Sequence, residues 1–283
     1  MAKANLIIGG FTNYGINQLK PWVLSAKEVA DENTDIVLVQ GNATKETIHW
    51  LLEQGVIPVP MAVMNNVPVH VLRFISIYSY LKNHWQEYDY VVTTDVKDVY
   101  FQTSPFEDVK RFCQIGYKLI IASEGLKYKD EPWGNQNLLQ TYGSYIHEQF
   151  KENEIFNVGT FGGESEYVKD MVFHIFTNGT NRPIPIVDQA VFNVLINTHP
   201  FKEIVARTHD WAAELGTIMD PSKIEQFRPN LMYQEPTFKD GLIKDGNVTY
   251  PIVHQYDRVP EIKKFVQEKY GQEDESQYFI YRT

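Results

Sequence analysis

The chain has 283 residues, of which 43% are hydrophobic and 13% aromatic, so it can bury a sizeable core and is not a disordered protein. Its formal net charge of −10 argues against binding to nucleic acid, which normally requires a basic surface. The single cysteine, Cys113, excludes a disulfide within the chain and a zinc site built from cysteines.

The start of the chain lacks both the basic residues and the long apolar run of a secretion signal. No stretch reaches the roughly 18 apolar residues that a membrane span needs. We therefore expect a soluble, cytoplasmic protein that is not secreted and has no membrane span. The sequons at Asn42, Asn178 and Asn247 are then expected to be chance occurrences.

Short apolar runs alternate with helical stretches through the first half of the chain. The runs that predict strands are at residues 6–8, 35–39, 90–94 and 118–122. Helices are predicted at residues 22–30, 44–54 and 68–85, with Pro21 suited to the first position of the first one. The prolines in 56–63 predict an edge strand or a loop. This alternation is typical of an α/β fold in which right-handed crossovers join parallel strands.

The second half of the chain contains further helical stretches and one hairpin signal. Helices are expected at residues 165–177, 188–196 and 260–270. The segment 127–137 is expected to be irregular, and 154–163 is rich in glycine. A hairpin is expected over 239–258, turning at Asp245-Gly246, with 250–253 as its returning strand. The acidic tail after Gln272 is expected to pack loosely.

Two carboxylates, Asp95 and Asp98, directly follow the predicted buried strand at 90–94. Carboxylates crowded at a strand end repel each other, so a positive group is expected to hold them together. A divalent cation shared with a phosphorylated ligand suits these oxygen ligands, while an Asp-rich turn is the alternative. Asn13 and Glu124 also follow predicted strands. Because α/β sheets bind ligands at the carboxyl ends of their strands, this convergence favours a metal–nucleotide site.

Several other residues each have a functional and a structural interpretation. Arg73 is either a solvated helix charge or a group that reaches Asp95 and Asp98. Asp188 is either a helix cap, worth about 1 kcal/mol, or a carboxylate on the acceptor side of a site. Asp210, in an expected loop, is a second acidic candidate. His254, at a strand end, is either a structural hydrogen-bonding group or a further metal ligand.

Aromatic residues in the polar segment 127–137 are also ambiguous. Tyr128 and Trp133 are able to stack on sugar rings, although aromatic residues in loops more often hold the loop in place.

In this order the motifs resemble those of glycosyltransferases with the A-type (GT-A) fold. That fold is Rossmann-like, with a mixed, mostly parallel central sheet flanked by helices. In it an aspartate pair, usually one residue apart, follows a central strand and holds a divalent ion on the diphosphate of a sugar nucleotide. Here Val96 and Lys97 separate Asp95 from Asp98, which leaves open whether Asp95 binds the metal or the ribose.

The remaining motifs are similar to those of glycogenin-like transferases. Phe11, Thr12, Asn13 and Tyr14 match their nucleotide-base loop, and Arg73 matches their donor-contacting arginine. The segment 156–159 and Asp188-Gln189 resemble acceptor-side motifs, and His254 matches a late metal histidine. The resemblance runs over residues 6–258. No repeat, linker or low-complexity tract divides the chain, which predicts a single domain, 1–283. Its nucleotide-sugar lobe is expected over about 1–106 and its acceptor lobe, with the metal-histidine segment, over about 107–271.

The resemblance also implies a reaction. A UDP-sugar would be the donor, and a hydroxyl of a glycan or glycoprotein the acceptor. The compact size and the segment 94–99, Thr-Asp-Val-Lys-Asp-Val, are similar to the small xylosyltransferases encoded by chloroviruses. That narrower likeness implies a virus-encoded enzyme that transfers xylose from UDP-xylose to a fucose of an N-glycan.

Each site residue then has an expected role. Asp95, Asp98 and His254 would bind the metal, and an imidazole ligand favours Mn²⁺ over Mg²⁺. Besides Arg73, the cations Lys97 and Arg258 would stabilise the leaving diphosphate. If the reaction inverts configuration, Asp188 is the first candidate for the base and Asp210 the second, whereas retention requires no base there.

Two other classes of function remain open. A metal-dependent nucleotide-sugar hydrolase or phosphoesterase would also use acidic ligands, although two-metal sites usually draw on more clustered histidines than the eight scattered here. A glycan-binding module without catalysis would explain exposed aromatics but not an aspartate pair at a strand end.

Overall fold

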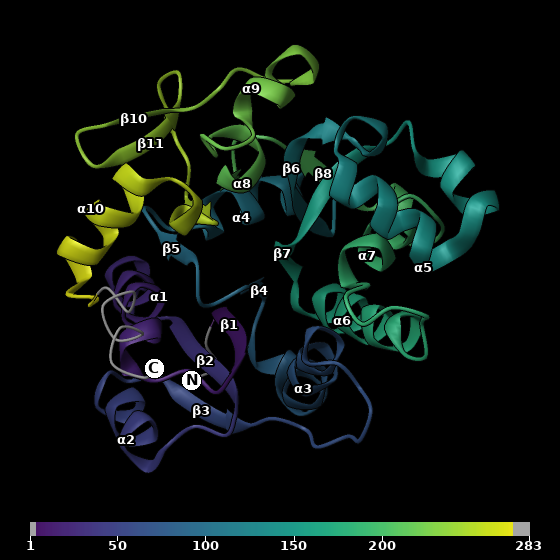
Figure 1. The fold of residues 1–283 in the computed structure, drawn as a ribbon. Coiled ribbons are helices and arrows are strands. Elements are labelled where there is room, and N and C mark those ends of the chain that lie inside the picture. Colours follow the sequence, from purple (N-terminus) through teal and green to yellow (C-terminus); the bar gives the residue numbers. More distant parts are fainter. Residues whose placement is uncertain (1–3, 274–283) are drawn as a thin grey trace, which may run out of the picture.

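A seven-stranded sheet forms the centre of the computed structural model, which describes residues 4–273 (Figure 1). The strand order is β3-β2-β1-β4-β7-β6-β8. Strand β7 is antiparallel to its neighbours β4 and β6, and the other pairings are parallel. The strands are β1 Asn5–Thr12, β2 Thr34–Gly41, β3 Ile57–Pro60, β4 Tyr90–Thr94, β6 Leu119–Lys127, β7 Glu154–Glu164 and β8 Val205–Thr208. The predicted α/β class with a mixed, mostly parallel sheet is confirmed.

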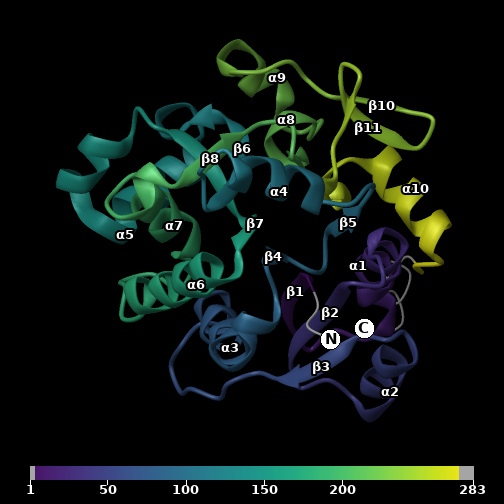
Figure 2. The ribbon, with the colours of Figure 1, turned by 180° about the vertical axis from the view of Figure 1, so that it is seen from behind.

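Helices cover both faces of this sheet, because side chains that alternate along each strand point to opposite faces. On β1, Leu6 and Ile8 pack into one core and Ile7 into the other. The first core is closed by α3 Val69–His84, α6 Ser165–Gly179 and α7 Asp188–Ile196. The second is closed by α1 Ile16–Val29, α2 Lys45–Glu53 and α4 Phe106–Gln114. Figure 2, from behind, shows α3 beside α6 and α10 (Pro260–Tyr270) beside α1.

Strand β1 is longer than the sequence predicts. It continues through Gly9 and Gly10 to Thr12, so the first two residues of the expected nucleotide loop belong to the strand. A Cβ on Gly9 would lie 2.6 Å from Cγ2 of Val96, and a Cβ on Gly10 2.9 Å from Cγ2 of Val39. The glycines therefore allow close packing in a central strand and do not begin a loop.

Several other elements differ from the expected ones. Helix α1 begins at Ile16, so Pro21 lies inside it and not at its first position. The segment 127–137 is not irregular: after a 3₁₀ turn, helix α5 runs over Pro132–Phe150. The buried Glu131 side chain accepts hydrogen bonds from the backbone N–H groups of Trp133 and Gly134, which caps this helix. Tyr128 is buried, so it has no surface to offer a sugar.

The structure contains a hairpin turn where the sequence predicts one, but the returning strand is not the predicted one. Strands β10 Thr237–Lys239, β11 Leu242–Asp245 and β12 Val248–Thr249 form a small antiparallel sheet that turns at Gly246-Asn247. The segment expected to return does not join this sheet. Instead, β13 Ile252–His254 lies between β5 Val99–Phe101 and β9 Ala212–Glu214. The expected returning strand at 250–253 is therefore wrong, and this pairing brings His254 beside the residues that follow β4.

The remaining elements are short, and the end of α10 agrees with the prediction. The short helices and 3₁₀ turns are α8 Leu215–Ile218, α9 Ile224–Phe227, η1 Trp85–Glu87, η2 Tyr128–Asp130, η3 Phe201–Glu203, η4 Arg228–Asn230 and η5 Tyr256–Arg258. Helix α10 ends at Gly271, whose φ of 62° is the left-handed conformation that glycine accepts readily. The expectation for the acidic tail falls largely on residues 274–283, outside the described part of the chain.

The central sheet runs through both of the expected lobes, since β4 pairs directly with β7. The lobe boundary near residue 106 remains a prediction. Among residues 4–273, no helix is both long and apolar enough to cross a membrane.

Candidate active site

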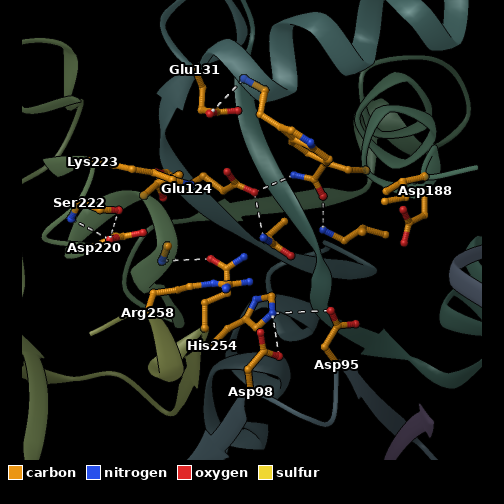
Figure 3. A pocket seen from close by; sticks show the side chains of 18 of the residues that line it. Asp95, Asp98, Glu124, Glu131, Asp188, Asp220, Ser222, Lys223, His254 and Arg258 are labelled. Carbon is orange, nitrogen blue, oxygen red and sulfur yellow. Dashed lines mark hydrogen bonds and ion pairs between the residues drawn. The ribbon is translucent and has the colours of Figure 1, made fainter. Parts of the chain in front are cut away.

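Asp95, Asp98 and His254 meet at the carboxyl end of β4, as Figure 3 shows. Asp95 and Asp98 lie in the turn between β4 and β5, and His254 is the last residue of β13, next to β5. His254 Nε2 lies 3.6 Å from Asp95 Oδ2 and 3.6 Å from Asp98 Oδ1. One ligand atom from each residue lies within 4.8 Å of the other two, a spacing and donor set that fit a divalent cation.

Gly159, on β7, makes room for these three side chains. A Cβ there would lie 2.6 Å from His254 Cε1 and 3.0 Å from Asp95 Cγ. The Gly159 carbonyl also accepts a 2.7 Å hydrogen bond from the backbone N–H of Asp95, which fixes the start of the turn. A residue without a side chain is therefore required at position 159, because a Cβ there would clash with His254 and Asp95.

Glu214 determines how the His254 ring is oriented. Its carboxylate is fully buried, and its Oε2 lies 2.6 Å from His254 Nδ1. The hydroxyl of Thr160 donates a 2.5 Å hydrogen bond to the other oxygen of Glu214. Because Nδ1 is held by a carboxylate, Nε2 is the nitrogen left to face Asp95 and Asp98, an arrangement common for histidine metal ligands.

The protonation of His254 follows from its neighbours. Burial by itself lowers the pKa of this imidazole, but the negative charges of Glu214 and Asp98 outweigh burial and raise it to about 9. Below about pH 9 the metal-free ring is therefore protonated on both nitrogens.

Metal binding is expected to strengthen as the pH rises, because a ligating nitrogen must first lose its proton. Since His254 holds that proton up to about pH 9, the apparent Kd for Mn²⁺ should fall by about tenfold per pH unit below that pH. Calorimetry in buffers of different ionisation enthalpy measures both the Kd and the proton release, which should approach one per ion. A Kd independent of pH below pH 9 would show that His254 is not a ligand.

Replacing Glu214 with glutamine is expected to weaken Mn²⁺ binding by about 10- to 100-fold, because the charge that orients and polarises His254 is lost. Calorimetry of the purified variant measures this change. The exposed pair of His199 and Glu203, 3.0 Å apart, offers a matched control, and Glu203→Gln should leave Mn²⁺ binding unchanged. If Glu214→Gln bound Mn²⁺ as tightly as the unchanged chain does, the role given to Glu214 would be contradicted.

Arg73 joins the metal-ligand cluster to Asp188. Its guanidinium forms an ion pair with Asp95 through Nη1 and a 3.0 Å pair with Asp188 through Nη2, and its side chain is 14% exposed. Of the two interpretations of Arg73, the structure shows the one in which it reaches Asp95. Asp188 is the first residue of α7, and no hydrogen bond from its side chain caps that helix.

A cavity of about 870 Å³ opens above the cluster, a size typical of small-molecule sites. Its wall includes predicted site residues and residues that the sequence analysis did not select. The predicted ones are Arg73, Asp95, Asp98, Asp188, His254 and Arg258. Glu124, Asn157 and Gln189, which the sequence analysis placed at a strand end or in acceptor-side motifs, also line the cavity. Among the residues that it did not select are His70, Glu131, Thr217, Asp220, Lys223 and Gln255.

Glu124 is held in place by two amides whose orientation is fixed. Asn157 Oδ1 accepts from the backbone N–H of Gly159 at 2.7 Å, and Gln189 Oε1 accepts from that of Val158 at 2.9 Å. Both amide nitrogens therefore point to Glu124 Oε1, at 2.8 Å and 2.7 Å. Burial, followed by the charges of Glu214 and Glu131, raises the pKa of Glu124 to about 8. Its Oε2 has no hydrogen-bond partner among the described residues and remains available to a ligand.

Other predicted residues lie outside the cavity wall. Phe11 is buried at the end of β1 and stacks on Tyr14, with ring centroids 6.0 Å apart. Tyr14 is half-buried and close to the site: burial, followed by the charge of Asp98, raises its pKa. Asn13 packs beside the end of β2, where its N–H donates to the Gly41 carbonyl. Thr12 ends β1 and contacts Gly41.

Lys97 and Asp210 also lie away from the cavity wall. The Lys97 side chain is exposed, between the two aspartates in sequence but not facing the cavity. Asp210 lies close enough to Tyr250 for its charge to contribute to that residue's raised pKa, after burial and Asp245. It therefore sits near the small antiparallel sheet, and the geometry favours Asp188 over Asp210 as a group that faces a substrate.

Glu214 is the main residue that the sequence analysis missed. It ends the short strand β9, after Ala212 and Ala213, so it repeats the pattern of an acidic residue that closes an apolar run. That pattern was the available signal, but the strand is only three residues long, with two apolar residues before Glu214.

Comparisons with known proteins place this geometry in a structural class. No family model matches the sequence, and no curated protein matches it. Among solved structures, the chain is similar to the apo structure of WbbM, a bifunctional glycosyltransferase, with a TM-score of 0.58 and 11% sequence identity. The match covers 100% of this chain and 52% of the WbbM chain, so the present chain spans about half its length. This chain therefore shares the fold of the part of that glycosyltransferase which it matches.

The glycosyltransferase fold confirms the predicted architecture. At 11% identity the likeness to WbbM concerns the fold alone. The narrower likeness to chlorovirus xylosyltransferases stays a prediction.

Proposed function

We propose that this chain is a metal-dependent glycosyltransferase that moves a sugar from a nucleoside diphosphate onto a hydroxyl of a glycan. The observation that carries the proposal is the meeting of Asp95, Asp98 and His254 beneath a cavity at the carboxyl end of β4. In α/β sheets this edge is where ligands bind. The glycosyltransferase fold supports the same conclusion.

Asp95, Asp98 and His254 would hold the divalent cation, and a histidine among the ligands favours Mn²⁺ over Mg²⁺. Once bound, the ion supplies positive charge for the diphosphate that leaves the sugar. Arg73 balances Asp95 and keeps it in place. Arg258, on the cavity wall and half exposed, adds a second cation; its Nε lies 3.6 Å from Asp257 Oδ1. Lys97 and Tyr14, with the 11–14 segment, are proposed to contact the nucleotide beside the cavity.

The acceptor side of the site is assigned to Asp188. Its Oδ2 is held by Arg73, and its Oδ1 has no hydrogen-bond partner among the described residues. We assign Asp188 to take the proton of the acceptor hydroxyl in an inverting reaction. Glu124 Oε2 is placed to bind a sugar hydroxyl, because its partner oxygen is already saturated by Asn157 and Gln189.

The finer identity of the substrates follows from the sequence resemblance. UDP-xylose is the proposed donor and a fucose of an N-glycan the proposed acceptor.

Titration of UDP into the protein with and without Mn²⁺, followed by calorimetry, tests the proposal. Binding that depends on Mn²⁺ is expected, and a glycan-binding module should show none. A parallel thermal-shift screen of UDP, GDP and CMP sugars identifies the donor base. Product analysis then separates transfer from hydrolysis: a hydrolase releases free sugar at the same rate with and without an acceptor glycan, and that outcome would overturn the transferase assignment.

A further inference from the structure

Two large apolar side chains on the cavity wall, Trp133 and Ile186, are unusually exposed. Trp133 is 53% exposed and Ile186 is 39% exposed, and both line the cavity. By contrast, Trp22 and Trp211 are buried in the core. An apolar ring left open on a concave wall gains free energy when a ligand covers it, which makes such a position typical of a binding site.

The segments that carry these two side chains are tied together. The buried carboxylate of Glu131 accepts from the backbone N–H of Trp133 at 3.3 Å and from that of Gly134, so the start of α5 is rigidly capped. Asn137, one turn further along α5, donates a 2.7 Å hydrogen bond from Nδ2 to the carbonyl of Ile186. The backbone positions of the ring and its neighbour are therefore set before any ligand binds, which lowers the entropic cost of binding.

Hydrogen-bonding groups lie next to this apolar wall. Asp188 follows Ile186 by two residues and faces the same cavity, and Glu124 also lines it, with its carboxyl Oε2 outside the hydrogen bonds of Asn157 and Gln189. A pyranose has a face of C–H groups that packs on an indole and an edge of hydroxyls that donate to carboxylates. Because the acidic side chain of Asp188 lies on the same wall, an anionic sugar is disfavoured there.

We propose that Trp133 and Ile186 form the acceptor subsite and that it takes an uncharged pyranose at the end of a glycan. The ring of this sugar packs on Trp133, which leaves one of its hydroxyls within reach of Asp188. The inference rests on the proposed glycosyltransferase function in naming this sugar an acceptor. The binding of an uncharged sugar against Trp133 is observable without any transfer.

Saturation-transfer NMR with neutral methyl glycosides tests the subsite directly. The probes are the methyl glycosides of fucose, galactose and glucose, with methyl glucuronide as the anionic comparison, each added to the full chain with UDP and Mg²⁺ and again without them. At least one neutral glycoside is expected to bind. Trp133→Ala should weaken that binding by about tenfold, and Trp133→Phe should restore most of it.

Tyr145 provides a matched control, because it is an aromatic residue on α5 that is 76% exposed and does not line the cavity. Tyr145→Ala should leave glycoside binding unchanged. The subsite is overturned if no neutral glycoside binds under either condition, if methyl glucuronide binds more tightly than the neutral sugars, or if Trp133→Ala binds as well as the unchanged chain.

The same samples separate this inference from the proposed function. Calorimetry with UDP and Mn²⁺ reports only on the nucleotide side of the cavity. If the unchanged chain binds no UDP in the presence of Mn²⁺ but binds a glycoside in a manner that depends on Trp133, the sugar subsite is supported and the transferase function is excluded. Mn²⁺-dependent UDP binding without any effect of Trp133→Ala on glycoside binding would retain the transferase and remove the subsite.

Discussion

Replacing Asp98 with alanine is expected to abolish sugar transfer and leave the fold intact. The change removes one of the three groups whose ligand atoms meet within 4.8 Å, so both the metal and the charge that it brings to the leaving diphosphate are lost. The rate of transfer should fall by at least about a hundredfold, the loss typical when a main electrostatic contact of the transition state is removed. Transfer from a labelled UDP-sugar and calorimetry with Mn²⁺ measure the two effects.

The fold should tolerate this change because Asp98 is surrounded by other acids. Its charge contributes to raising the pKa values of His254 and Asp257, so its removal relieves repulsion with Asp257 while it costs an attraction to His254. Thermal unfolding should therefore occur near the temperature of the unchanged chain. Asp170→Ala, on the exposed surface of α6, is the matched control and should transfer sugar at the normal rate. Normal transfer by Asp98→Ala would remove the metal role.

Replacing Asp188 with asparagine is expected to slow transfer far more than it weakens UDP binding. Asparagine keeps the shape of the side chain and an oxygen that accepts from Arg73, but it cannot take a proton. The loss of a general base should lower kcat by roughly 100- to 10,000-fold, while the Kd for UDP with Mn²⁺ stays close to its original value.

Asp108 provides the control for Asp188. It is also an aspartate in the first turn of a helix, α4, and it also pairs with an arginine, Arg111, at 2.6 Å. Asp108 does not line the cavity, so Asp108→Asn removes a similar charge and ion pair at another place and should leave transfer unchanged. Equal losses of UDP binding and of kcat in Asp188→Asn would indicate a structural role at the start of α7. NMR of the anomeric configuration of the product adds a second check, because a retained configuration would exclude Asp188 as the base of an inverting reaction.

The sequence predicted most of the central sheet because its signals are local. Four-residue and longer apolar runs such as 90–94 and 35–39 mark strands that are buried on both faces, and they require no knowledge of their partners. Helix ends were equally readable where the sequence placed a capping residue, as with Gly271 after α10. Helix α5 was missed although Glu131 and Pro132 are good helix-start residues, because its apolar positions do not form a continuous stripe and its aromatics suggested a loop.

The site was only partly predictable for a related reason. Asp95 and Asp98 are visible in sequence because they follow a recognisable strand. His254 was a candidate, but its place depends on β13 pairing with β5 and β9, whereas local turn chemistry pointed to the small sheet of β11 and β12. The ion pairs of Arg73 likewise depend on which face of α3 packs against the sheet. The sequence of that helix does not by itself fix this orientation.

By itself, then, the sequence determined that this is an α/β chain with an acidic strand end suited to a cation. These features arise from the spacing of apolar side chains and from residues next to one another in the chain. The tertiary structure alone decided that His254, Glu214 and Arg73 surround that strand end, and that Trp133 faces the cavity above it. Such contacts between distant segments are set by strand pairing and core packing, whose energies depend on partners far away in the sequence.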